Sequence, residues 1–186
     1  MDDIDLLSGV LDKTGDLIAG VKPDQLGLST PCPDYDVAIL RDHIVGWLQV
    51  FEAGANERTP GGDPLQFHCG DDPEGEFRRA AAGVVDGWRQ HGLDREVAIS
   101  SGGKMPGQMV FNMTLMEYLT HGWDLATATS QPVLYREDEA ADVLERAKAT
   151  LPPEFQGDGM PFGAIVPVAD DASAVDRLMG FMGRQP

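Results

Sequence analysis

The sequence predicts a mainly all-α protein, a four-helix bundle with one short β excursion and extra C-terminal helices. Several long segments carry apolar residues at the three- and four-residue spacing of a buried helix face. One short stretch alternates like a strand, and segments rich in Pro and Gly separate the helices. We find no internal repeat and no linker that divides the chain, which predicts a single domain over residues 1–186.

The first two helices are predicted on either side of a proline-rich loop. Residues 2–19 have apolar positions at helical spacing, although two glycines weaken the pattern. The loop 21–36 contains Pro31 and Pro33, and a helix cannot continue across them. Asp36 suits the N-cap of the second helix, which is expected to run to about residue 55.

The remaining elements follow from the same spacing and breaker rules. They are a loop at 56–73, a helix at 74–91, the β excursion at 95–99, helices at 107–129 and 137–149, a loop at 152–171 and a last helix at 172–182. Gly92 suits a C-cap for the third helix. The acidic start of 137–149 complements the helix dipole.

Composition excludes several classes of protein. The formal net charge is −17, which repels phosphate backbones and anionic lipid surfaces and argues against nucleic-acid and membrane binding. No apolar run approaches the roughly 20 residues that cross a bilayer. The acidic N-terminus differs from a secretory signal, so a cytoplasmic location is expected. Two cysteines, Cys32 and Cys69, are too few for a disulfide framework.

Three side chains on two predicted helices form a candidate metal site. His43 lies within the apolar stripe of the second helix. Glu117 and His121 are four residues apart, so the helix at 107–129 stacks them on one face. Two His and one carboxylate form a ligand set of open catalytic zinc sites and of non-haem iron sites. In such a site, water or a substrate atom takes a remaining position.

Each of these residues has a simpler interpretation. A lone His on an apolar helix face is more often a core residue than a ligand. A buried carboxylate at Glu117 must be paired, protonated or metal-bound, and His121 alone can pair with it. His68, in a loop, and His91, at a helix end, are poorer candidates. Spacing alone leaves the metal-bound and metal-free interpretations open.

Four residues near these positions have default interpretations that involve no site. Asp124 is either an acceptor for a ligand imidazole or a solvated helix carboxylate, and solvation is the default. Arg184, close to the C-terminus, is expected to be solvated unless it holds a substrate group. Cys69 directly follows His68 in a loop, and the default interpretation is that this adjacency is a coincidence and not a metal site. The acidic neighbours of Cys32 favour an inert thiol.

Three motifs carry a resemblance to a known family. Residues 30–37 (TPCPDYDV) and 40–46 (LRDHIVG) resemble the start of the DinB/YfiT-like metal-binding superfamily, in its actinobacterial branch. Residues 117–126 (EYLTHGWDLA) are similar to the second ligand motif of that branch. Residues 167–173 (PVADDAS) and 183–184 (GR) resemble the C-terminal end of its sequences. The resemblance implies a DinB-like four-helix bundle in which His43, Glu117 and His121 bind a divalent metal.

The same resemblance implies an activity. The branch resembles the N-terminal domain of mycothiol-dependent maleylpyruvate isomerase and includes mycothiol S-transferases. We therefore expect a metal-dependent enzyme with mycothiol as co-substrate and an electrophilic small molecule as its second substrate. The expected ion is Zn²⁺, with Ni²⁺ or Fe²⁺ as alternatives. A homodimer is expected from the superfamily and from the apolar last helix, whose Leu178, Met179 and Phe181 would need cover.

Other functions fit the same residues. A metal-dependent hydrolase would activate water in place of a thiol. A non-catalytic metal-binding bundle in a stress response would keep the ligands without turnover. In a third interpretation no metal binds, and His43 is a core residue. The sequence does not separate these functions.

Overall fold

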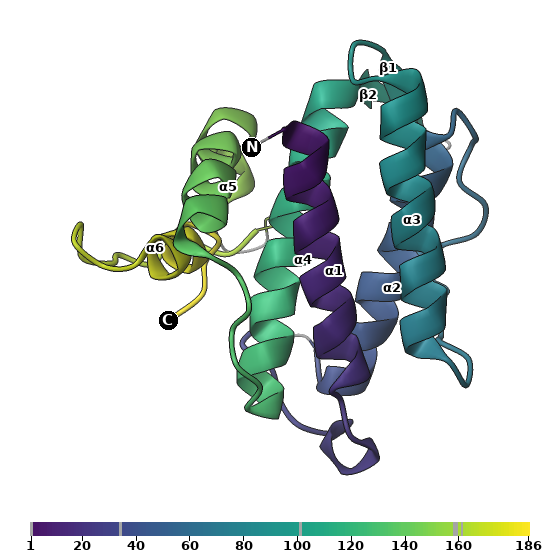
Figure 1. The fold of residues 1–186 in the computed structure, drawn as a ribbon. Helices are drawn as coiled ribbons and strands as arrows, with labels where there is room; N and C mark the ends of the chain where they lie inside the picture. Colours follow the sequence, from purple (N-terminus) through teal and green to yellow (C-terminus); the bar gives the residue numbers. More distant parts are fainter. Residues whose placement is uncertain (1, 34, 101, 158–159, 161) are drawn as a thin grey trace.

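Four long helices form the bundle. The computed structural model describes residues 2–33, 35–100, 102–157, 160 and 162–186. The bundle helices are α1 (Asp3–Ala19), α2 (Val37–Ala55), α3 (Pro73–His91) and α4 (Gly107–Thr129). Helices α1 and α2 each pack against both α3 and α4, so the order around the bundle is α1–α3–α2–α4 (Figure 1). The predicted mainly helical bundle is confirmed.

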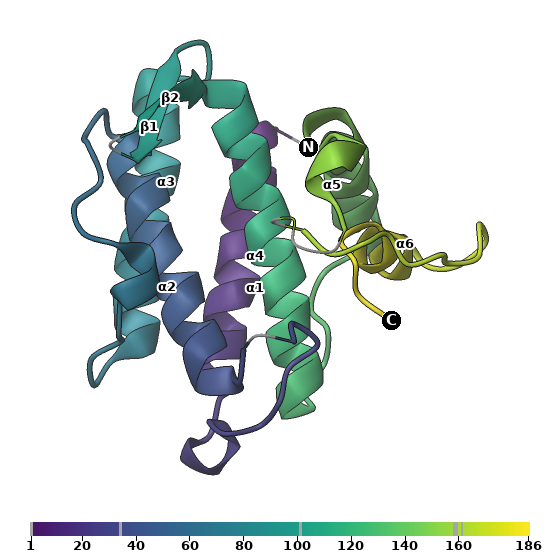
Figure 2. The same cartoon turned by 180° about the vertical axis from the view of Figure 1, so that it is seen from behind.

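The shorter elements lie at one end and along one side of the bundle. Strands β1 (Glu96–Ser100) and β2 (Gly103–Pro106) form an antiparallel hairpin between α3 and α4, as the alternating stretch predicts. Helix α5 (Glu137–Thr150) packs along α4, and α6 (Ala174–Phe181) packs on α5 (Figure 2). Single 3-10 turns lie at Pro23–Gln25, Pro64–Gln66 and Pro153–Phe155. Within the described ranges, no helix has the length and apolarity that a membrane span requires.

Local side-chain chemistry sets the helix boundaries. The Asp36 side chain accepts a hydrogen bond from the Ile39 amide at 2.8 Å and starts α2, as predicted. Gly92 ends α3 with a φ of +68°, and its amide donates to the Trp88 carbonyl at 2.9 Å. The last helix is shorter than the predicted 172–182, because Ser173 serves as its N-cap.

One apolar core runs through the bundle. Its largest fully buried side chains are Trp88, Tyr118, Phe77, Phe111, Leu6, Leu7, Leu11, Leu17, Leu40, Ile44, Leu48 and Leu115. Met109, an apolar residue in the first turn of α4, is 36% exposed. The buried face at the start of α4 passes through Val110 and Phe111, and successive helix residues point in different directions, so Met109 faces solvent.

The apolar face of the last helix has cover within the chain. Leu178 and Met179 are fully buried, and α6 packs on α5. Leu178 and Met179 therefore need no second copy to cover them, whereas Phe181 is half-buried. A homodimer stays a prediction that rests on the resemblance alone.

Candidate metal centre

The three predicted ligands lie together at the contact between α2 and α4. His43 Nε2 is 2.7 Å from Glu117 Oε1, and His121 Nε2 is 3.6 Å from the same oxygen. One ligand atom from each residue lies within 4.8 Å of the other two. The structure thus brings together residues 74 positions apart in the chain. Metal binding itself stays a prediction.

Packing on both sides of His43 fixes the helices that carry the site. Leu40 and Ile44, one turn before and one residue after His43, are fully buried in the core. The Tyr118 hydroxyl, next to Glu117 in α4, donates a hydrogen bond to the Ile44 carbonyl at 3.2 Å. This bond joins α2 and α4 one residue away from the candidate ligands on each helix. The site therefore sits on two rigid elements held in register.

Each imidazole has a separate partner on its other ring nitrogen. The Tyr35 hydroxyl is 3.2 Å from His43 Nδ1, and Asp124 Oδ2 is 2.9 Å from His121 Nδ1. Asp124 holds the proton on His121 Nδ1, so the Nε2 of a neutral His121 carries a free lone pair. The Tyr35 hydroxyl can donate or accept and thus suits either tautomer of His43. Both rings therefore fit metal ligation through Nε2.

The charges of the site also fit a cation. Burial raises the pKa of Glu117, but the facing His121 and the hydrogen bond with His43 outweigh it and lower the pKa to about 2. Burial lowers the pKa of His121, but Glu117 and Asp124 outweigh it and raise the pKa overall. With neutral imidazoles, the two carboxylates outnumber the one guanidinium at the site, that of Arg184. The resulting net negative charge favours a bound cation.

The side chains of the candidate ligands keep a small exposed fraction. The side chains of His43, Glu117 and His121 are 12%, 20% and 10% exposed. The ring centroid of Tyr35 is 4.9 Å from that of His43, and the ring of half-buried Trp47 is 6.3 Å from His43. A small molecule approaching the ligands therefore meets an aromatic border.

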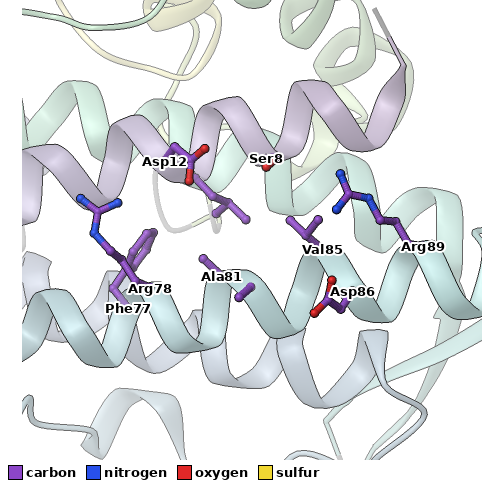
Figure 3. Close-up of a pocket in the computed structure, with 10 residues that line it drawn as sticks. Ser8, Asp12, Phe77, Arg78, Ala81, Val85, Asp86 and Arg89 are labelled. Atoms are coloured by element: carbon purple, nitrogen blue, oxygen red, sulfur yellow. The ribbon is translucent and has the colours of Figure 1, made fainter.

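A separate hollow lies elsewhere on the bundle. It has a volume of about 260 Å³ and lies between α1 and α3, with Ala81 and Val85 along it and Arg78 and Arg89 toward its ends (Figure 3). In the order α1–α3–α2–α4, this pair of helices is opposite the α2–α4 contact. The hollow contains none of the candidate ligands.

Two default interpretations from the sequence were wrong. Asp124 was expected to be solvated, but it is fully buried and contacts His121. Arg184 was also expected to be solvated, but its side chain is 11% exposed and is paired with Asp124. Burial of an unpaired aspartate would be energetically costly. Arg184, which lies 60 residues further along the chain, compensates the charge of Asp124 by pairing with it. The useful signal in the sequence was the three-residue spacing between His121 and Asp124.

The other histidines and the second cysteine lie outside this group. His68, 83% exposed, contacts Asp42 through Nδ1 at 2.9 Å. Burial, followed by a hydrogen bond with Asp42, raises the pKa of the Cys69 thiol to about 12. His91 Nδ1 lies 3.4 Å from Glu57 Oε2. His68 and Cys69 both contact Asp42, and among the described residues neither belongs to the candidate ligand group. Tyr35, which contacts His43, appeared in the sequence analysis only within a motif.

Known proteins share both the sequence pattern and the fold. Residues 7–126 match the family described as "Mycothiol maleylpyruvate isomerase N-terminal domain". Two relatives come from Mycobacterium tuberculosis: uncharacterized protein MT0763 of strain CDC 1551 / Oshkosh and uncharacterized protein Rv0738 of strain ATCC 25618 / H37Rv. Each is 31% identical over an alignment of 180 residues, and each match covers 90% of this chain and 90% of the relative.

Two crystal structures of mycothiol-dependent maleylpyruvate isomerase resemble the chain in fold. The first has a TM-score of 0.54 at 13% identity, and a single-substitution mutant of that enzyme has a TM-score of 0.56 at 16% identity. Each match covers 83% of this chain and 68% of the other. At this level of identity the likeness establishes the fold alone.

Proposed function

Because the chain belongs to the mycothiol maleylpyruvate isomerase N-terminal domain family, we propose that it is a metal-dependent enzyme that uses a low-molecular-weight thiol. The observation that carries the proposal is the convergence of His43 Nε2 and His121 Nε2 on Glu117 Oε1. The thiol is mycothiol, which the family description and the fold relatives name. The second substrate is an electrophilic small molecule.

The residues of the site divide the work between them. His43, Glu117 and His121 would hold a divalent ion, Zn²⁺ in our proposal, through two nitrogens and one oxygen. A bound ion of this kind lowers the pKa of a coordinated thiol and so supplies a thiolate at neutral pH. Tyr35 and Asp124 orient the two imidazoles, and Glu117 stays anionic throughout the neutral range.

Two features favour a catalytic site over a structural one. Among the described residues the ligand group has three members, whereas structural zinc sites are closed by four protein ligands. All three side chains also keep some exposure, which gives a substrate access. The bundle has its own apolar core, so we expect it to fold without the ion.

The proposed reaction has a simple balance. The thiol sulfur forms a bond with an electrophilic carbon while a π bond of the substrate opens, and the thiol proton ends on the substrate atom that receives that electron pair. In a transferase the conjugate is the product, whereas in an isomerase the carbon–sulfur bond breaks again and the thiol is returned. Product analysis therefore separates the two outcomes within one assay.

The test begins with metal analysis of freshly purified protein, for which we expect about one divalent ion per chain. Conjugation of a model electrophile is then measured with metal-loaded and chelated protein, using mycothiol and glutathione in turn. We expect a rate that needs both metal and mycothiol, with glutathione slower because its polar groups would lack partners in a pocket built for sugar hydroxyls.

The control variant is His68→Ala, which removes an exposed histidine that lies outside the ligand group. It should keep both metal and activity. Metal-dependent turnover without any thiol would instead indicate a hydrolase, and bound metal without turnover would indicate a binding module. Equal rates with and without metal would refute the proposal.

A further inference from the structure

A C-terminal arginine reaches the candidate metal centre through one intermediate residue. Arg184 Nε is 3.0 and 3.2 Å from the two Asp124 carboxylate oxygens, and Arg184 Nη2 is 2.9 Å from Oδ2. The same Oδ2 accepts the bond from His121 Nδ1 at 2.9 Å. A continuous chain of charged hydrogen bonds therefore runs from Arg184 through Asp124 to His121.

The backbone after α6 fixes the position of this arginine. Gly183 has a φ of +77°, and a Cβ there would lie 2.8 Å from Gly163 Cα, so the turn requires glycine. The Arg184 amide donates to the Met179 carbonyl at 2.8 Å, and its Nη1 donates to the Met182 carbonyl at 2.9 Å. The guanidinium is thus held at both its backbone and its head before it meets Asp124.

The contact provides what a buried carboxylate partner needs. Asp124 has no exposed surface, so without Arg184 its charge would be poorly compensated and its carboxylate plane free to turn. A guanidinium that contacts both oxygens fixes that plane, which a single point charge does not. The plane of Asp124 in turn determines where His121 directs its Nε2 atom.

The arginine belongs to a part of the chain beyond the family match. That match ends at residue 126, whereas α5, α6 and Arg184 all follow it. We propose that Arg184 is a positioning residue of the metal centre, so that docking of the segment 174–186 and metal binding strengthen each other. The inference rests on the metal site of the proposed function. It adds a contribution from the C-terminal segment to that site.

Coupling of this kind is reciprocal. If Arg184 strengthens metal binding by some factor, metal binding must strengthen the docking of Arg184 by the same factor. The Arg184 amide, bonded to the Met179 carbonyl, reports that docking. Its hydrogen exchange should therefore slow when the protein is loaded with zinc.

The experiment measures zinc affinity of the full chain by competition with a chromophoric chelator. The variants are Arg184→Ala, Arg184→Lys and Asp124→Ala, and Gln185→Ala is the matched control on an exposed neighbour in the same tail. We expect Arg184→Ala to weaken zinc binding by roughly 10- to 100-fold, as loss of an outer partner of a metal ligand commonly does. The zinc affinity of Arg184→Lys should lie between those of Arg184→Ala and the wild type, and that of Gln185→Ala should equal the wild-type affinity.

Two further measurements keep the test decisive. If Arg184 acts through Asp124, the double variant Arg184→Ala/Asp124→Ala should bind zinc as Asp124→Ala does, without additional loss. Zinc should also slow hydrogen exchange at residue 184 in Gln185→Ala as much as in the wild type, and by a smaller factor in Arg184→Lys. If Arg184→Ala does not fold, the affinity of Arg184→Lys and this exchange difference decide the question.

The outcomes separate this inference from the proposed function. The inference would be overturned if Arg184→Ala and Arg184→Lys bound zinc as tightly as the wild type, or if the losses of zinc affinity simply added in the double variant. Either result would leave the proposed enzyme intact. If Arg184→Ala bound zinc more weakly but the wild-type protein showed no thiol-dependent turnover, the inference would be supported and the proposed enzymatic function refuted. A wild-type chain that binds no zinc would overturn both.

Discussion

Gly122, between the candidate ligand His121 and Trp123, is the position at which we expect a single methyl group to be most damaging. A Cβ built on Gly122 would lie 1.7 Å from the Tyr135 hydroxyl oxygen and 2.7 Å from its Cζ atom. That hydroxyl is buried, donates to the Tyr118 carbonyl at 3.0 Å and lies 2.9 Å from Thr14 Oγ1. Gly122→Ala must therefore displace Tyr135 from α4.

The magnitude follows from three contributions. A buried hydroxyl left without its partners costs about 1–3 kcal/mol. Overpacking a filled core costs about 1–3 kcal/mol. The better helix propensity of alanine offsets about 1 kcal/mol of this loss. We expect Gly122→Ala to lower the free energy of unfolding by about 1–5 kcal/mol in the metal-free protein.

A second helical glycine provides the matched control. A Cβ on Gly9, inside α1, would lie 3.7 Å from Glu139 Oε1, which is an ordinary contact. Gly9→Ala should therefore raise the free energy of unfolding by about 0.5–1 kcal/mol. Urea unfolding of chelated protein, followed by circular dichroism, measures both variants. Gly122→Ala as stable as the wild type would refute the placement of Tyr135 against α4.

Three other predictions follow from the core and the site. His121→Ala should abolish zinc binding and leave the helices folded, whereas Leu125→Ala, at a fully buried position, should lower the free energy of unfolding by about 2–5 kcal/mol. Metal analysis and urea unfolding distinguish the two variants. A His121→Ala protein that does not fold would indicate a structural ion. In the metal-free protein, the lowered pKa of Glu117 gives stability that is lost as pH falls from its ordinary 4.5 toward about 2, and the raised pKa of His121 gives stability that is lost as pH rises above 6.5. Because zinc binds only deprotonated imidazoles, the thermal unfolding temperature should be highest between about pH 4.5 and 6.5 without zinc, and at a higher pH with zinc. Identical pH profiles with and without zinc would contradict this. A homodimer is predicted from the family resemblance, and light scattering that gives the one-chain mass over a wide concentration range would reject it.

Features that depend on neighbouring residues were predictable from the sequence. The cap at Asp36 and the stop at Gly92 are local choices of the backbone, and both helices begin or end where these residues predict. The stacking of Glu117 and His121 follows from the helix period alone. Their contact with His43 is not local, and spacing left it open; the family resemblance supplied it.

The contacts that the sequence did not reveal join distant segments. Arg184 meets Asp124 only because the chain turns at Gly183 against Gly163, and no periodic pattern encodes that approach. A charged residue near a chain end is usually solvated, so the general expectation favoured the wrong answer. The fully buried Asp124 was misjudged for the same reason, since its compensating charge lies 60 residues further along the chain.

The separation of the ligands along the chain has a consequence for folding kinetics. His43 and Glu117 are 74 residues apart, and α3 and the hairpin lie within the loop that closes when α2 and α4 meet. An ion therefore finds no preformed pair of helices in the unfolded chain and stabilises the protein only after that long loop has closed. Interactions completed after the transition state slow unfolding and leave the folding rate nearly unchanged. Zinc should thus lengthen the lifetime of the folded protein without hastening its formation.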